Sequence, residues 1–525
     1  MRRYKHNRSN TRIQTQDMGF ICPTGCRHVL HGTTVRGGIG SVMRLKPLVN
    51  PIYSEIDVMN WIIGVPDRVL WEDYENFVTG GQSGEERPEP PYIVAPAEGW
   101  AVGSLADYLG EPTGVPYYKS SALPFRAYAM WINENILNPQ LQPLLPVSFA
   151  SGEDKITNTT LQRINWQKDL FTTLTSEPQL GDDVIVPIAA NAPVTGHIGV
   201  YGNGKVIGLT NSTVKNNVPN GMLASSSSGD GAAVSAYDLL NNSNSTGSYG
   251  SWLQGHWGLS TSDRYSGIEA SSSQLNADLT QSTGVSVSSI KMAFSRQAWK
   301  IKRNLYGSAY KDLLSFLGIR YSDARLQLPQ TFAYGKSRVD ISEVLQTAPG
   351  TDSYVGNMAG RGTSFNRSSS CKVYFEESTT VIFLSCLRPK TIYVNIPNLD
   401  FNFKVREDIY TPEFAHVGMV PYYRGDLHPV GSDSDNEVLG YGNIYDSQRV
   451  AFNTVAGQFK TVDASYHLGR MFENQPALNS DFLQCNPTNR VFADMTNTQH
   501  IEVFTRHKWN EKSIVSKNGD PKFNL

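Results

Sequence analysis

Four residues near the N-terminus carry side chains of the kind that bind zinc. Cys22 and Cys26 are separated by three residues, and His28 and His31 follow closely. Thiolate sulfur and imidazole nitrogen form the tetrahedral ligand sets of zinc in proteins. The spacing matches no common zinc finger, however, and the cluster adjoins a basic segment. We therefore predict no metal site here.

Two other patterns resemble ligand-binding loops. Gly199–Lys205 begins like a phosphate-binding loop, but Val206 replaces the required Ser or Thr, and a strand-like run follows where the motif needs a helix. The segment therefore predicts a hairpin turn. The acids at 433, 435 and 437 lack the glycine and the glutamate spacing of a calcium loop, so we expect a solvated turn and no cofactor.

Motifs for catalysis do not occur. HExxH, GxSxG and a GxGxxG between a strand and a helix are missing, and the ten histidines are scattered. Paired carboxylates leave no sequence trace. No pattern in the sequence indicates catalysis, and we predict that the protein is not an enzyme.

Positive charge is concentrated in two segments. The first sixteen residues contain no acid and carry Arg2, Arg3, Lys5, Arg8 and Arg12. With so little apolar content, this segment should be disordered unless it meets an anionic partner; a frayed terminus is the simpler alternative. The segment 291–311 also carries six bases and no acid, which indicates either a solvated helix face or one that faces phosphate.

Composition limits the class of protein. The chain has 525 residues and a formal net charge of -2, which excludes a uniformly basic nucleic-acid coat. Charged residues make up 18% and aromatic residues 10%, with 45 Gly and 28 Pro, as in a large β-rich protein with long loops. No apolar run is long enough for a membrane-spanning helix, and no signal peptide follows the basic start. Five cysteines indicate a reducing compartment and no disulfide framework.

Periodicity predicts few helices and many strands. Phe125, Tyr128, Ile132 and Ile136 share one helical face, a second helix runs from about Val287 to Leu305, and a third from Tyr310 ends at Gly318. Strands are expected at 381–384 and 392–396. Across 221–250, seventeen of thirty residues are Ser, Gly, Asn or Thr, yet large apolar residues are interspersed. We therefore interpret 205–285 as a surface insertion, not as a linker, in a sandwich or jelly roll.

Five ordered segments resemble the major capsid proteins of microviruses, small tailless phages with circular single-stranded DNA, and especially their gokushovirus-like branch. They span nearly the whole chain and comprise Val65–Phe77, Ala122–Tyr128, Tyr321–Pro329, Phe414–Pro421 and Ala456–Phe459. Asp67, Ser322 and Leu328 depart from the residues that are usual in the family, which indicates a divergent branch.

The resemblance implies a mainly β fold, an eight-stranded viral jelly roll with long loop insertions and a few short helices. The resemblance implies that residues 1–30 form a basic internal arm and that residues 31–204 and 286–525 form the two parts of the jelly-roll domain. It implies that residues 205–285 form a protrusion at the threefold axes. The insertion carries more acids than bases, so we expect it outside the shell and the basic segments inside.

The implied function is structural. About sixty copies would form a T=1 icosahedral shell around the single-stranded DNA genome, in a virion assembled in the bacterial cytoplasm. Arg2, Arg3, Lys5, Arg8 and Arg12 would contact the DNA phosphates without reading sequence. Other partners would be scaffolding, pilot or further structural phage proteins and a bacterial surface receptor. The alternative is a β-sandwich glycan-binding protein or hydrolase, which should be a monomer or a small oligomer.

Overall fold

The computed structural model describes residues 3–182, 287–307, 309–345, 358–494 and 499–518, with short pieces at 184, 194–196, 198–202, 205–209, 275–277 and 356. The chain divides into two compact units, residues 1–181 with 300–525, and residues 182–299. The predicted insertion 205–285 falls within the second unit and lies mostly outside the described residues. Its bounds, and those of the other predicted domains, stay predictions.

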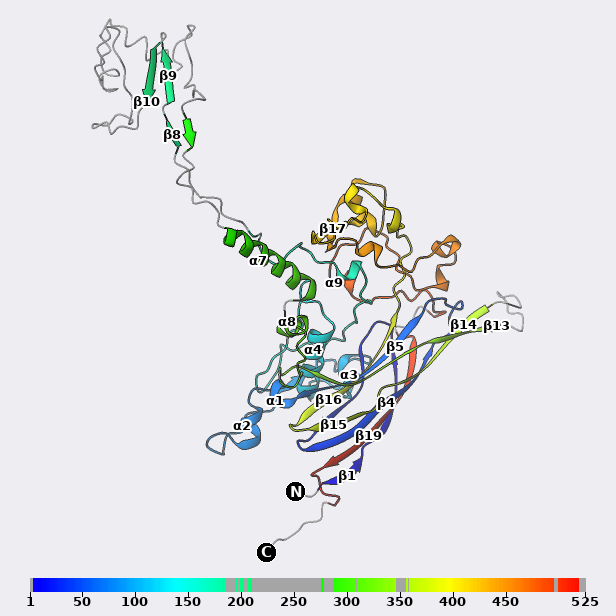
Figure 1. The fold of residues 1–525 in the computed structure, drawn as a ribbon. Helices are drawn as coiled ribbons and strands as arrows, with labels where there is room; N and C mark the ends of the chain where they lie inside the picture. Colours follow the sequence, from blue (N-terminus) through cyan, green and yellow to red (C-terminus); the bar gives the residue numbers. More distant parts are fainter. Residues whose placement is uncertain are drawn as a thin grey trace. The chain divides into compact units, whose positions relative to one another are not determined.

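The first unit is built on a seven-stranded antiparallel sheet (Figure 1). Its strands are β1 (Tyr4–Asn7), β2 (Asn10–Gln16), β4 (Thr33–Leu45), β13 (Asp340–Leu345), β14 (Met358–Arg367), β15 (Cys371–Phe375) and β19 (Ile501–Ser513). β19 and β4 are central: β1 and β2 pair end to end along one edge of β19, while β14 and β15 pair along the far edge of β4. The sheet thus joins both ends of the chain.

A four-stranded antiparallel sheet packs against the first one. Its order is β12 (Gln330–Arg338), β5 (Ile56–Pro66), β16 (Thr379–Pro389) and β3 (Cys22–Val29). Buried side chains of both sheets meet in two clusters, for example Met43 with Val58, and Trp509 with Phe383. The prediction of a mainly β sandwich is confirmed. The two sheets contain seven and four strands, and the expected count of eight for the jelly roll is not confirmed.

Helices cover the other face of the four-stranded sheet. α1 (Asp67–Leu70) contacts β5, α3 (Leu105–Leu109) contacts β3, and α4 (Leu123–Asn135) contacts β16. Figure 1 shows these helices on the side of the sheet away from β4 and β19. The largest buried cluster, which includes Ile63, Leu384 and Phe125, lies between this sheet and the helices. β5 and β16 are therefore buried on both faces, which explains their continuous apolar runs.

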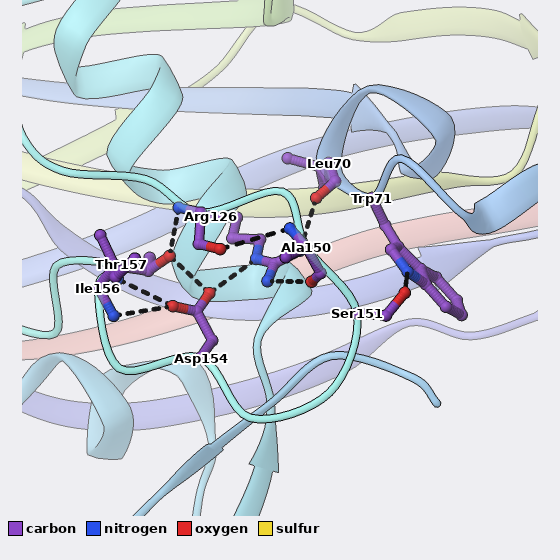
Figure 2. A network of polar contacts seen from close by, with 9 residues as sticks. Leu70, Trp71, Arg126, Ala150, Ser151, Asp154, Ile156 and Thr157 are labelled. Atoms are coloured by element: carbon purple, nitrogen blue, oxygen red, sulfur yellow. Dashed lines mark hydrogen bonds and ion pairs between the residues drawn. The ribbon is translucent and has the colours of Figure 1, made fainter. Parts of the chain in front are cut away.

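A buried polar network fixes the loop that follows α4. Arg126 Nε lies 2.9 Å from Asp154 Oδ2, and both side chains are fully buried. The guanidinium also donates to the carbonyls of Leu70 and Ala150, while Asp154 accepts from Thr157 (Figure 2). One side chain of the Ala122–Tyr128 segment thereby ties α4 to α1 and to the 146–157 loop.

Smaller elements complete the first unit. They are α2 (Tyr74–Thr79), α8 (Tyr310–Phe316), α9 (Ser480–Leu483), the pairs β6 (Tyr92–Val94) with β7 (Lys119–Ser121) and β17 (Met419–Tyr423) with β18 (Val438–Asn443), and the 3₁₀ turns η1 (Phe171–Thr173), η3 (Leu399–Phe401), η4 (Arg406–Asp408), η5 (Arg424–Asp426), η6 (Asp433–Asn436), η7 (Asp446–Gln448), η8 (Gly457–Lys460) and η9 (Ala464–Tyr466). A fourth buried cluster, which includes Phe171, Tyr393 and Tyr422, holds the long 390–490 region together.

The second unit contains short antiparallel pairs, β8 (Val194–Gly196) with β11 (Leu275–Ala277) and β9 (Ile198–Gly202) with β10 (Lys205–Leu209). Lys205 pairs with Gly202, so the glycine-rich segment is a hairpin, as predicted, and not a phosphate-binding loop. α7 (Val287–Tyr306) begins in this unit and ends in the first one.

The three predicted helices are confirmed as α4, α7 and α8, and the 381–384 strand as part of β16. The strand predicted at 392–396 is wrong. Tyr393 makes only isolated bridges, to Thr454 and Arg470, because its segment is buried by rings such as Phe171 and not paired in a sheet. Among the described residues, no helix is long and apolar enough to cross a membrane.

Candidate nucleic-acid interface

The N-terminal basic segment is part of the sheet. β1 and β2 take up Tyr4–Asn7 and Asn10–Gln16, and both pair with β19. The expectation of a disordered arm is therefore wrong for this part of the chain. The backbone hydrogen bonds along the edge of β19 provide an ordered partner that the composition of the segment alone does not reveal.

Two of the predicted DNA-contacting residues are engaged within the subunit. Arg8 forms an ion pair with Glu511, with 2.9 Å between Nη1 and Oε1. Arg12 donates to the backbone carbonyls of Asp107 and Tyr108, each at 2.8 Å, at the end of α3. Burial lowers the pKa of the Arg12 guanidinium, although nearby Asp107 opposes that shift. Both arginines therefore stabilise the packing of the N-terminal strands.

The other predicted residues differ from these. Arg2 lies outside the described residues. Arg3 donates to the Tyr374 hydroxyl at 3.2 Å and lies over that ring. Lys5 is exposed on β1, opposite Lys512 of β19, and it makes no ion pair within the described part of the chain. Of the four that the structure describes, Lys5 has the environment best suited to an external phosphate.

One side of the seven-stranded sheet is covered by no other element of the described residues, and it is here called the open face. It consists of the outward positions of β1, β2, β19, β4, β14, β15 and β13. Side chains alternate between the two faces of a strand, and β19 shows this regularly, since its buried and exposed residues alternate from Ile501 to Ser513. The register then shows which outward residues are neighbours.

The open face is strongly basic. Its exposed basic side chains are Lys5, Arg36, Arg44, Arg361, Arg367, Lys372, Arg506, Lys508 and Lys512. The acidic side chains at the outward positions of the same strands are Glu502 and Asp340. In the described part of the structure, none of these bases forms an ion pair with a carboxylate. Like charges left unpaired on one face raise the local positive potential.

Of the described residues in the predicted set, only Lys5 belongs to this unpaired group. The remaining members were missed because they lie on four other strands, far apart in the sequence. The period-two pattern of 501–513 and of 33–45 is the signal that could have found some of them. Which strands are neighbours depends on pairings such as β15 with β4, which the sequence does not reveal.

The second basic segment is partly neutralised. Lys311 Nζ lies 2.6 Å from Glu134 Oε2, and Lys302 lies over the ring of Phe316. A phosphate-facing role for the whole 291–311 segment therefore has little support from these two residues.

The cysteine and histidine pattern is dispersed by the fold. Cys22 is buried in β3, while His28 Nε2 lies 2.7 Å from Asp67 Oδ2 and His31 Nδ1 lies 3.4 Å from Ser378 Oγ. The hydrogen bond to Asp67 raises the pKa of His28, against the opposing effect of burial. Asp67 thus has a histidine and a threonine, Thr380, as side-chain partners.

Comparison with known proteins gives a consistent result. The model of the capsid protein (F protein) family of phages matches residues 1–515. Capsid protein VP1 of Chlamydia phage 1 is 28% identical, over 94% of this chain and 91% of that protein. Capsid protein VP1 of Spiroplasma virus 4 is 26% identical over 90% of this chain and 86% of that protein. Capsid protein VP1 of Bdellovibrio phage phiMH2K is 26% identical over 92% of this chain and 88% of that protein. The chain therefore belongs to the F-protein family of phage capsid proteins, which are structural shell components of the virion and not enzymes.

Proposed function

We propose that this protein forms a T=1 icosahedral shell of about sixty copies around a circular single-stranded DNA genome, with the open face directed towards the DNA. The observation that carries this proposal is the set of unpaired basic side chains on the open face. DNA phosphates would supply negative charge to these side chains, which form no ion pair among the described residues.

The layered structure supports this orientation. The four-stranded sheet is covered on one side by the seven-stranded sheet and on the other by α3 and α4. Among the described residues, the open face thus remains a broad sheet surface that is available for an external ligand. Its lysine and arginine side chains come from several strands and therefore spread over a wide surface. Such a surface suits the flexible sugar-phosphate backbone of single-stranded DNA, which it would bind without sequence preference.

The remaining expectations belong to the same proposal. The 205–285 insertion forms a protrusion on the outer surface at the threefold axes and takes part in host attachment. Its excess of acids over bases favours that position. Residues 31–204 and 286–525 form the jelly-roll domain, and 1–30 contribute internal contacts. Assembly takes place in the bacterial cytoplasm with other phage structural, scaffolding or pilot proteins, and a bacterial surface receptor recognises the particle.

The test is the DNA content of particles assembled from a variant. The variant removes positive charge from three neighbouring strands of the open face. It combines Arg36→Gln, Lys372→Gln, Arg506→Gln and Lys508→Gln. We expect particles of normal size with less DNA, measured as the ratio of absorbance at 260 and 280 nm in purified particles.

The matched control changes exposed bases elsewhere, Arg87→Gln and Lys168→Gln, and should leave the DNA content unchanged. Normal DNA content in the open-face variant would contradict the proposed orientation. Imaging of the same particles tests the insertion, because it must appear as threefold knobs on the outside.

A further inference from the structure

A row of apolar side chains crosses the open face. The register places Ile13 of β2 opposite Phe504 of β19, Phe504 opposite Val42 of β4, and Val42 opposite Phe365 of β14. Because neighbouring strands lie about 4.8 Å apart, the row is roughly 14 Å long. Ile13, Phe504 and Phe365 are 81%, 44% and 75% exposed. We call these four residues the apolar row.

The two phenylalanines of the row have no aromatic partner within the described residues. Rings elsewhere in the first unit pack in pairs, such as Phe383 with Trp509 and Phe171 with Tyr393. Phe365 and Phe504 instead present their rings to the outside, although exposed phenylalanine on a sheet gains little for the fold. The row is therefore a surface that an external apolar or aromatic group can cover.

Basic residues border the row on both sides. On one side, Arg44 of β4 lies next to Val42 and opposite Glu502 of β19; on the other side lie Arg506 and Arg367. Between Arg506 and Arg367 the outward position of β4 is Gly40. A Cβ atom added at Gly40 would meet nothing within 4 Å, so packing within the subunit does not require glycine there.

We propose that the apolar row is a stacking surface for the bases of single-stranded DNA, while the bordering arginines bind its phosphates. This inference rests on the proposed function, in which the open face meets the genome. Aromatic rings stack on any base, so such a surface binds single strands without reading sequence. In a duplex the base faces are already stacked on one another, and only the charge of the open face would then contribute.

Charge complementarity favours DNA over a protein as the occupant. A protein segment that covered only the apolar row would leave Arg367 and Arg506 next to it without counter-charges, whereas Arg44 has Glu502 opposite it. A single strand presents both an aromatic group and an anion in each nucleotide, which matches an apolar row that has Arg506 and Arg367 along one side. Gly40 gives the strand room between the two arginines.

The experiment measures binding by the full chain, purified as unassembled subunits. The probes are a fluorescent oligothymidylate and a duplex of the same length, and the readout is anisotropy over a range of salt concentrations. One variant, Phe365→Leu with Phe504→Leu, keeps the surface apolar and removes both rings. A second, Gly40→Val, fills the space between the arginines with a residue that suits a strand. The matched control is Phe401→Leu with Phe403→Leu, which changes exposed rings elsewhere.

We expect the open-face ring variant to bind oligothymidylate roughly tenfold more weakly, with unchanged affinity for the duplex and an unchanged salt dependence. Gly40→Val should also weaken single-strand binding, with an unchanged melting temperature. Wild-type affinity in both variants would overturn the stacking surface. The proposed function survives if the variant with four lysine and arginine residues changed to Gln, described above, still forms particles that contain less DNA. If the ring variant binds DNA normally but no longer forms particles, the row contacts protein and the inference is wrong.

Discussion

Arg126 and Asp154 form an ion pair in which neither side chain is exposed, with 2.9 Å between Nε and Oδ2. Burial alone would raise the pKa of Asp154, but hydrogen bonds from Thr157 and Arg126 outweigh it and lower the pKa. The carboxylate therefore stays ionised at neutral pH and needs its cationic partner.

Arg126→Met should lower the free energy of unfolding by about 3–5 kcal/mol, because it leaves the Asp154 carboxylate buried without a counter-charge. Urea denaturation of unassembled subunits measures this change. The control is Arg449→Ala, which breaks an exposed ion pair with Asp446 and should cost less than about 1 kcal/mol. Equal losses in the two variants would show that the buried network does not hold the 146–157 loop.

His507 should make the subunit sensitive to mild acid. Its ring is buried between Thr24 and Asn10, and burial, with smaller effects of Arg27 and Arg12, lowers its pKa to about 4. Between the ordinary histidine pKa of about 6.5 and pH 4, the unfolded chain binds a proton that the folded chain excludes. Stability therefore falls as the pH decreases through this window, by an amount on the order of 3 kcal/mol.

His507→Gln should flatten this pH dependence. Glutamine keeps a polar group near Thr24 and does not titrate. Urea denaturation at several pH values between 4 and 7 measures the slope for the variant and for the wild type. His416→Gln is the comparison, because His416 is exposed. An unchanged slope in His507→Gln would assign the acid sensitivity to other groups.

The helices and the buried strand could be predicted because their signal is local. α4 follows from apolar residues at helical spacing after Pro124, and β16 from an uninterrupted apolar run. The sheets could not be assembled in the same way. β1 pairs with β19 through residues such as Lys5 and Lys512, which are about five hundred positions apart. A local signal can also mislead. Residues 392–396 have the apolar pattern of a strand because they are buried among loops, but they do not pair in a sheet.

The candidate site was only partly predictable for the same reason. Lys5 and Arg12 belong to one basic segment, yet they have different environments. Arg12 pairs with Thr505, at an inward position of the sheet, and its guanidinium reaches α3. Lys5 pairs with Lys512 at an outward position. A shift of one residue in register exchanges the two faces of a strand, so the role of each base depends on the pairing and not on the composition.

Two glycines on β4 should respond differently to substitution. A Cβ at Gly37 would lie 2.5 Å from Cε3 of Trp509, whose ring is fully buried, whereas a Cβ at Gly40 would meet nothing within 4 Å. Gly37→Ala should therefore destabilise the subunit by about 1–3 kcal/mol through overpacking. Gly40→Ala should be neutral or stabilise it by up to about 1 kcal/mol, because alanine restricts the unfolded chain.

Thermal melting of the two alanine variants measures this difference directly. Both substitutions add the same methyl group to the same strand, so each is the control for the other. A lower melting temperature for Gly40→Ala than for Gly37→Ala would mean that the open face is covered within the subunit, and it would also argue against DNA as its ligand.

The N-terminal bases should separate into two functional groups. Arg12→Met removes a charged donor from the carbonyls of Asp107 and Tyr108, and should lower the free energy of unfolding by about 1.5–3 kcal/mol. Lys5→Gln removes an exposed charge that has no carboxylate partner in the described part of the chain, and should leave stability within about 0.5 kcal/mol.

The effects of these two substitutions on DNA binding should be opposite to their effects on stability, with Lys5→Gln the more harmful of the two. Lys5→Gln should weaken oligothymidylate binding and reduce the slope of log K against log salt by about 0.7, the value for one lost phosphate contact on a single strand. Arg12→Met should leave that slope unchanged at a temperature where the subunit is still folded. A reduced slope for Arg12→Met alone would place the N-terminal contact with DNA at the inward-facing arginine. Changing all the N-terminal bases together would not distinguish these outcomes, because loss of folding and loss of phosphate contacts would both lower the DNA content of the particle.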